Sequence, residues 1–316
     1  MSRIVHLSDL HFGTESPAVL AALERAVHAL APDVVVVSGD LTQRARRTEF
    51  AAARRFLDAL PGRHVVVPGN HDIPLYNPVA RALWPFRRYR ETFGPTGTAV
   101  VEHGALRIVT VNSVRRERHA GGHVTRGRRF AVAAHARAAP PGSVTIVVAH
   151  HPLGTTRADG SPVEDRRTLE HWRRSGVRLV LSGHEHRAFL RRGGEGHGRG
   201  GARRRLGRRG RTGERVSDAA SDDARGELWV LNAGTALSRR LRHARPNSFN
   251  VVDVPDGVAG DDERSGDAST IAGAHPRPLT IERHDFDPTT AAFVLGERRR
   301  TDAPEAGREP RPAPRP

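Results

Sequence analysis

The amino-acid sequence predicts an α/β fold, in which helices are layered on sheets. Two observations lead to this prediction. Short apolar runs rich in valine are nearly continuous, as in strands that are covered on both faces. Apolar residues at helical spacing stand between several of these runs, so strands and helices alternate through residues 1–186.

The first six predicted strands precede residue 187. They are RIVHLS (3–8), VVVVS (34–38), HVVV (64–67), LRIVTV (106–111), VTIVVA (144–149) and VRLVLS (177–182). Apolar residues at helical spacing predict helices over 19–30, 50–60 and around 169–172. The first helix opens with Ser16-Pro17, an N-cap followed by proline at the first helical position.

Segments that cannot bury much apolar surface interrupt the second half of the chain. We expect a disordered Gly/Arg-rich insertion at 191–226, a second, acidic and Gly-rich surface insertion at 255–278, and a disordered Pro/Arg-rich tail at 299–316. Strands resume as LWVLNAG (228–234), NSFNVVDV (247–254), LTIERHDF (279–286) and AAFVLGE (291–297), the last two forming a hairpin. The sequence therefore predicts one domain over residues 1–298.

The composition limits the possible metal ligands and partners. No cysteine is present, so disulfides and thiolate sites are excluded and any metal must be held by His, Asp, Glu or Asn. No apolar run approaches the ~20 residues of a membrane helix, and the N-terminus lacks an apolar leader, so we expect a cytoplasmic protein with no membrane span. Residues 187–215 carry more than half of the net charge of +16, which favours a solvated insertion over a nucleic-acid arm.

Metal-ligand side chains follow five of the predicted strands, at the point where each strand ends. The strands lead into Asp9-Leu10-His11, Gly39-Asp40, Asn70-His71-Asp72, His150-His151-Pro152 and Gly183-His184-Glu185-His186. In an open α/β sheet, ligand sites assemble at the carboxyl ends of the strands. We therefore expect these side chains to meet at one edge of the sheet.

The spacing within the motifs supports a shared centre. Residues two apart in extended chain point the same way, so Asp9 and His11, and likewise His184 and His186, are expected to approach a common point. Glycine precedes Asp40, Asn70 and His184, which suits a tight turn and close backbone approach. The carboxylates, amide and imidazoles together are too many for one ion and suit two.

Taken together, the blocks DLHFG, SGDL, PGNHD, HHP and SGHEH resemble the ordered motifs of the calcineurin-like metallophosphoesterases. The resemblance covers residues 1–254, apart from the insertion. LSDLHFG, PGNHDIPLYN and NAGTALSRR with NSFNVVDV resemble the class III cyclic-nucleotide phosphodiesterase branch. The resemblance implies a two-sheet sandwich flanked by helices, formed by a single domain.

The resemblance also implies a metal-ligand set and a catalytic residue. One metal would be bound by Asp9, His11, Asp40 and His186, and the other by Asp40, Asn70, His150 and His184, so that Asp40 bridges the two. The ions would be drawn from iron, manganese and zinc. His71 would donate a proton to the leaving oxygen or stabilise charge beside it.

Three assignments stay open at this point. Asp72 either supports an imidazole or caps the following turn, and His151 is the alternative to His150 as a ligand. Arg239 and Arg240, after the NAGTALS turn, either reach a substrate phosphate or are surface charges.

The predicted activity is metal-dependent hydrolysis of phosphodiester bonds. Two cations can hold a hydroxide between them and clamp the phosphate oxygens, which provides a nucleophile at neutral pH. We favour a small phosphoester substrate, a 3′,5′-cyclic nucleotide such as cyclic AMP. The alternatives are a nuclease or general phosphatase of the same fold, and a non-catalytic metal-binding scaffold. Nucleic acid is a possible but less favoured partner, and the sequence does not decide the oligomeric state.

Overall fold

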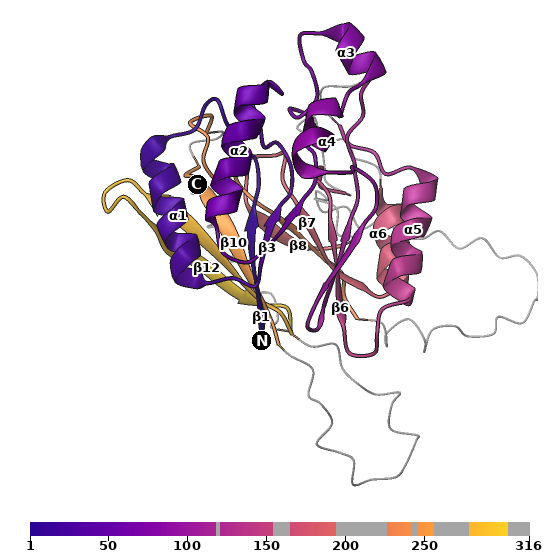
Figure 1. Ribbon diagram of the computed structural model, residues 1–316. Helices are drawn as coiled ribbons and strands as arrows, with labels where there is room; N and C mark the ends of the chain where they lie inside the picture. The colour runs from indigo at the N-terminus through magenta and orange to yellow at the C-terminus, as the bar shows by residue number, and fades with distance from the viewer. Residues whose placement is uncertain (118–120, 154–164, 194–225, 242–244, 256–277, 303–316) are drawn as a thin grey trace, which may run out of the picture.

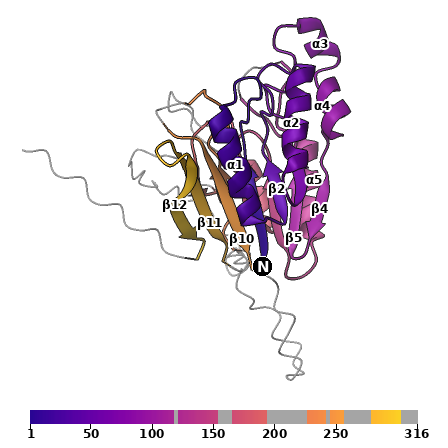
Figure 2. The same ribbon diagram turned by 60° about the vertical axis from the view of Figure 1, so that its left-hand side comes forward.

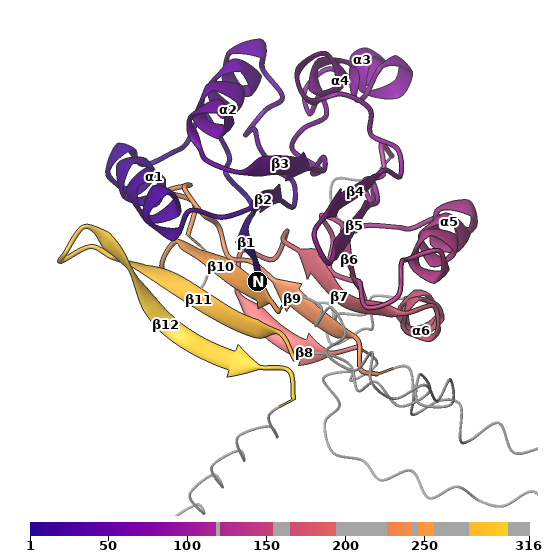
Figure 3. The ribbon, with the colours of Figure 1, turned by 60° about the horizontal axis from the view of Figure 1, so that its bottom comes forward.

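Two six-stranded sheets pack at the centre of the fold, with helices on their outer faces (Figures 1 and 3). The computed structural model describes residues 1–117, 121–153, 165–193, 226–241, 245–255 and 278–302. The first sheet has the order β12 (Ala292–Arg300), β11 (Thr280–Asp287), β10 (Ser248–Val254), β1 (Ser2–Leu7), β2 (Val34–Val37) and β3 (Arg63–Val66). The second has the order β4 (Val100–His103), β5 (Leu106–Thr110), β6 (Val144–Val148), β7 (Val177–Ser182), β9 (Trp229–Asn232) and β8 (Phe189–Arg192). The α/β class and the two-sheet sandwich are confirmed.

Helices flank both sheets. α1 (Pro17–Leu30) and α2 (Arg47–Ala59) cover the first sheet, and α5 (Arg126–Arg137) and α6 (Arg166–Arg174) cover the second (Figure 3). Between β3 and β4 the chain forms α3 (Pro78–Leu83) and α4 (Arg87–Phe93), and α3 projects beyond the ends of the sheets (Figures 1 and 2). None of the helices described is long and apolar enough to cross a membrane.

The valine-rich strands contain unbroken apolar runs because each strand packs against an apolar layer on both of its faces. In β2, Val34 and Val36 pack between the two sheets, whereas Val35 and Val37 pack toward α1 and α2. Alternate residues of a strand point to opposite faces, so a strand covered on both sides has no polar position left. This is why the pattern read from the sequence located β1, β2, β6 and β7 to within one or two residues.

The ends of the predicted insertions need correction. Arg191 and Arg192 belong to β8, which pairs with β9, rather than to a disordered insertion beginning at residue 191. Arg191 is buried and donates from Nη2 to the carbonyl of Leu153 at 2.7 Å, and Arg192 lies over the ring of Trp229. The arginine-rich composition gave no apolar pattern by which to predict this strand. Its arginine side chains nevertheless pack along apolar surface while their charged ends find partners.

The C-terminal boundary also differs from the prediction. β12 continues to Arg300, and the backbone N–H of Thr301 donates to the carbonyl of Leu279 at 3.0 Å, so the tail does not begin at residue 299. Pairing with β11 orders this charged stretch despite its exposed side chains. The hairpin predicted around Asp287-Pro288 is confirmed. The rest of the predicted insertions and tail, over 194–225, 256–277 and 303–316, lies outside the described residues.

Truncating the buried tryptophan of α6 should destabilise the fold. Trp172 is fully buried and donates from Nε1 to the carbonyl of Arg129 at 3.1 Å. We expect Trp172→Ala to lower the free energy of unfolding by about 3–5 kcal/mol, measured by urea denaturation followed by circular dichroism. Trp84→Ala is the matched control, because Trp84 is 58% exposed and its removal should change stability by less than about 0.5 kcal/mol. Equal losses in the two variants would contradict the assigned packing.

Candidate metal centre

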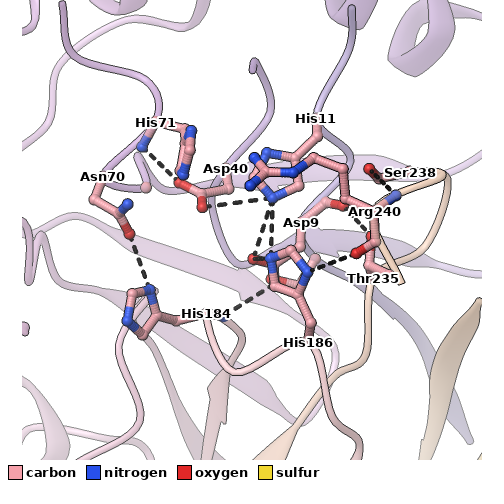
Figure 4. A network of polar contacts seen from close by, with 12 residues as sticks. Asp9, His11, Asp40, Asn70, His71, His184, His186, Thr235, Ser238 and Arg240 are labelled. Atoms are coloured by element: carbon pink, nitrogen blue, oxygen red, sulfur yellow. Dashed lines mark hydrogen bonds and ion pairs between the residues drawn. The ribbon is translucent and has the colours of Figure 1, made fainter. Parts of the chain in front are cut away.

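The polar motifs meet where the carboxyl ends of strands from both sheets come together (Figure 4). The loops after β1, β2 and β3 come from the first sheet, and those after β6 and β7 come from the second. Backbone hydrogen bonds join neighbouring loops, from the N–H of Asp9 to the carbonyl of Gly39 and from the N–H of Gly183 to the carbonyl of His150. The five strand-end motifs are therefore parts of a single site.

Most of these side chains point into the site because their own backbone is left-handed, and not because alternate residues of an extended strand point the same way. Asp9, His11, Asp40, His184 and His186 all have positive φ, between 48° and 72°. The expectation that paired residues converge through extended chain is therefore wrong, although the side chains do converge. Each such residue costs on the order of 1–2 kcal/mol, so the surrounding structure must impose the conformation. Concentrated strain of this kind is typical of functional sites.

Four buried side chains form the first cluster of donor atoms, Asp9, His11, Asp40 and His186. His186 Nε2 lies 3.0 Å from His11 Nε2 and 3.2 Å from Asp9 Oδ1. His11 Nε2 is 3.8 Å from Asp40 Oδ2. His186 Nδ1 donates to the carbonyl of Arg240 at 3.3 Å, which in the neutral ring leaves a lone pair on Nε2. This lone pair faces other acceptors, an arrangement that a cation would stabilise.

The second cluster repeats this pattern around Asn70. Its Oδ1 lies 3.0 Å from His150 Nε2 and 2.9 Å from His184 Nδ1. His150 Nδ1 donates to the carbonyl of Ser38 at 2.8 Å, so the neutral ring turns a lone pair toward Asn70. His150 Nε2 also lies 3.4 Å from Asp40 Oδ1. Oxygen and imidazole donors without sulfur suit a divalent or trivalent transition metal.

Asp40 contributes one carboxylate oxygen to each cluster. Oδ2 faces His11 and Oδ1 faces His150, and the side chain is almost completely buried. Oδ1 also accepts the backbone N–H of His71 at 2.8 Å, which fixes the orientation of the carboxylate. Two donor clusters that share one carboxylate have the arrangement required to hold two metal ions side by side.

The electrostatics favour the protonation states that bind metal. Burial opposes ionisation of Asp9 and Asp40, but the imidazoles of His186 and His150 outweigh burial and hold both carboxyl pKa values below the usual range. Burial lowers the pKa of His11 and of His184 to about 4, so both rings are neutral at pH 7. The carboxylates and these two imidazoles are therefore in the forms that coordinate a cation.

His150 is the exception among the imidazoles. Burial lowers its pKa, but the charge of Asp40 and a hydrogen bond with it outweigh burial and raise the pKa to about 9. A proton on His150 thus neutralises part of the charge of Asp40 when no metal is bound. A metal at this position would take over that role and displace the proton.

The glycines before the ligand residues allow close packing of the loops, as predicted. A Cβ at Gly39 would lie 2.6 Å from His150 Nδ1, one at Gly69 would lie 2.1 Å from the backbone N of Asp40, and one at Gly183 would lie 1.8 Å from Ser8 Oγ. Of the three, only Gly39 has a left-handed φ, of 97°. Close approach, more than turn geometry, therefore explains these glycines.

Asp72 caps backbone donors and does not support an imidazole. Its carboxylate accepts the N–H groups of Leu41, Thr42 and Gly69 and the hydroxyl of Thr42, at 2.8–3.2 Å. The ring of His71 is instead held by a contact of 2.9 Å between its Nδ1 and the carbonyl of Gln43. Neither alternative is therefore correct as stated, because the capped donors belong to the loop after β2 and to Gly69 and not to the turn that follows Asp72. Burial and the charge of Asp40 raise the pKa of Asp72 to about 7.

His151 lies beside the second cluster, and a nitrogen of its ring lies within 4.8 Å of ligand nitrogens of His150 and His184. Its Nδ1 is 2.9 Å from Ser113 Oγ, and its ring centroid lies 4.4 Å from that of His184. His150, in contrast, reaches both Asn70 and Asp40. The geometry favours His150 as the ligand, and the alternative that His151 coordinates a metal stays a prediction.

Two supporting contacts were not predicted from the sequence. Thr235 donates its hydroxyl to the carbonyl of Asp9 at 2.7 Å, and the carbonyl of Arg240 orients His186 (Figure 4). Both lie in the NAGTALSRR segment, whose likeness to a phosphodiesterase motif is the one signal that could have found them.

A family profile described as calcineurin-like phosphoesterase matches residues 2–188, more than half of the chain. The chain belongs to the calcineurin-like phosphoesterases. It is a metallophosphoesterase, a hydrolase that acts on phosphoester bonds. The members of this family use a dinuclear metal centre, which matches the two clusters that share Asp40.

Two curated relatives show the range of activities among similar proteins. A probable cyclic nucleotide phosphodiesterase from a Synechococcus species is 27% identical over 206 residues, which cover 59% of this chain and 74% of that protein. A UDP-2,3-diacylglucosamine pyrophosphatase from Chlamydia muridarum is 38% identical, but over only 77 residues and 23% of each chain.

Solved structures share the fold of this phosphoesterase at low sequence identity. A purple acid phosphatase from yellow lupin has a TM-score of 0.60 and 11% identity, over 90% of this chain and 51% of the lupin chain. A dimetal phosphatase from Danio rerio has a TM-score of 0.52 and 10% identity, over 93% and 98% of the two chains. The two-sheet architecture is thus that of known metallophosphatases.

Adding one methyl group at Gly69 should weaken metal binding. The new Cβ would overlap the backbone and the carboxylate of Asp40, so the loop after β2 must shift. We expect Gly69→Ala to reduce metal affinity at least about tenfold, measured by titration and by elemental analysis of the purified protein. Gly97→Ala is the control, because its Cβ would meet open space. Unchanged metal affinity in Gly69→Ala would contradict the proposed position of Asp40.

Proposed function

We propose that this chain is a dinuclear metal-dependent phosphodiesterase, with 3′,5′-cyclic nucleotides such as cyclic AMP as its favoured substrates. The observation behind the proposal is that the two donor clusters share the buried carboxylate of Asp40. Asp9, His11 and His186 complete one ligand set, and Asn70, His150 and His184 complete the other. Iron, manganese and zinc are the proposed ions, because all three accept oxygen and imidazole ligands.

The bound ions would supply activated water and positive charge for phosphodiester hydrolysis. The chain's own residues set the positions of the reacting groups. Asp40 holds both ligand sets in register because its two oxygens face different clusters. Asn70 and His184 come from opposite sheets, so closing the second ligand set depends on the packing of the sandwich.

His71 is proposed to give a proton to the leaving oxygen. Its ring lies edge-on to that of His11, with centroids 4.8 Å apart, which places it beside the first cluster (Figure 4). Nδ1 donates to the carbonyl of Gln43, so Nε2 is the atom that can exchange a proton with a substrate. A general acid of this kind contributes roughly 10²–10⁴-fold to the rate.

The cyclic-nucleotide preference is supported by similarity. The relative from Synechococcus is named as a probable cyclic nucleotide phosphodiesterase, and the chain covers 74% of its length. The motifs after β1 and β3 resemble the same branch. The metal ligands are common to the whole family, so they support the reaction, whereas the choice of substrate depends on the residues around them.

A panel of substrates tests the proposed function. We expect protein loaded with manganese to hydrolyse cyclic AMP and bis-para-nitrophenyl phosphate faster than a phosphomonoester, 2′,3′-cyclic nucleotides or single-stranded DNA. A chelator should abolish the activity, and added metal should restore it, because the ions supply the activated water. A preference for DNA that weakens steeply with salt would favour a nuclease. No hydrolysis of any substrate by metal-loaded protein would exclude the proposed activity.

Two substitutions separate metal binding from proton transfer. We expect His71→Ala to lower kcat by at least about 100-fold while metal content stays near that of the unmodified protein. Asp40→Ala should lose metal, because both clusters depend on its carboxylate. Elemental analysis and steady-state kinetics on the same preparations provide both measurements. Equal metal loss in the two variants would refute this division of roles.

A further inference from the structure

Arg240 lies in the loop after β9 and borders the metal centre. Figure 4 shows its side chain extending from this loop toward His11. The residue is exposed, so a ligand can reach the side chain from solvent. None of the proposed metal or proton-transfer roles uses its guanidinium.

Hydrogen bonds hold the backbone of Arg240 in place. Its N–H donates to Ser238 Oγ at 3.0 Å, and its carbonyl accepts Nδ1 of the proposed metal ligand His186 at 3.3 Å. Ser238 is itself fixed, because its Oγ lies 3.0 Å from Thr14 Oγ1 and its carbonyl accepts Nδ2 of Asn247 at 2.9 Å. The loop therefore presents the side chain from a defined position next to the first cluster.

The charge of Arg240 is available to a ligand. Within the ranges that the structure describes, no carboxylate forms an ion pair with Arg240. Other arginines of this chain do pair: Arg3 with Asp253 at 2.8 Å, and Arg87 with Glu91 at 2.9 Å. An unpaired guanidinium beside a metal centre that acts on phosphoesters is suited to an anionic oxygen.

We propose that Arg240 binds the non-bridging oxygens of the substrate phosphate and positions it over the metal centre. The inference rests on the proposed phosphodiesterase function. The planar guanidinium offers two parallel N–H groups, a geometry that matches two oxygens of one phosphate. The backbone carbonyl of the same residue orients His186, so substrate binding and metal coordination share one loop.

The adjacent Arg239 provides a matched control. It is exposed like Arg240, and its backbone N–H is bonded to the carbonyl of Thr14 at 3.0 Å. Removing Arg239 changes the net charge as much as removing Arg240, so the pair separates a local contact from general electrostatic attraction.

Kinetics provide the first test. We expect Arg240→Ala to raise KM for the hydrolysed phosphodiester roughly ten- to hundredfold, as expected for loss of a charged hydrogen bond. Its metal content should match that of the unmodified protein, because the variant keeps the backbone carbonyl that holds His186. The KM of Arg240→Lys should lie between those of the unmodified protein and Arg240→Ala. Arg239→Ala should change KM by less than about twofold. Equal effects of Arg239→Ala and Arg240→Ala would overturn the proposal.

Binding of inorganic phosphate provides a test that does not depend on turnover. Calorimetric titration of metal-loaded protein should show at least about tenfold weaker phosphate binding in Arg240→Ala and unchanged binding in Arg239→Ala. Phosphate affinity that is the same in Arg240→Ala and the unmodified protein would overturn the proposal, as would loss of metal from that variant. If the unmodified protein hydrolyses no phosphoester yet binds phosphate through Arg240, the phosphodiesterase proposal fails, and only the assignment of Arg240 as a phosphate-binding residue stands.

Discussion

The buried carboxylate of Asp40 is the contact on which the rest of the site depends. It comes from the first sheet, and its Oδ1 lies 3.4 Å from His150 of the second sheet. A buried anion is costly unless positive charge and hydrogen-bond donors surround it. Here the backbone N–H of His71 and two imidazoles provide part of that compensation. Packing of the two sheets thus brings together both the donors and the charge they must neutralise.

Strain and clustered lone pairs make this region unfavourable in the absence of a cation. Five of the proposed ligands have left-handed backbone, and histidine nitrogens lie 3.0–3.2 Å from amide and carboxylate oxygens. The apolar layers on either side of the sheets hold the loops in this arrangement. Any ion that binds the folded chain but not the unfolded chain adds to its stability. Metal affinity and fold stability are therefore linked through the same loops.

The supporting contacts divide into two groups with different effects. Asp72 gathers backbone donors from the loops after β2 and β3 and so keeps Asp40 and Asn70 in register. Arg240 acts beside the first cluster, where its carbonyl accepts a hydrogen bond from His186 and its side chain extends toward His11. The first group secures the position of the ligands. The second orients His186 and, in the role proposed for Arg240, places a positive charge where an anionic substrate would approach.

The sequence by itself determined the core strands and the residue types at their ends, because both are local patterns. Continuous apolar runs located β1, β2, β3, β6 and β7, and the motifs after them supplied every member of the two clusters. Short or arginine-rich elements such as α3, α5 and β8 were missed, since their apolar positions are too few to form a pattern. Tertiary structure alone decided that Asp72 caps a loop 31 positions away and that the side chain of Arg240 extends toward His11. These outcomes depend on contacts between distant segments, which no local pattern records.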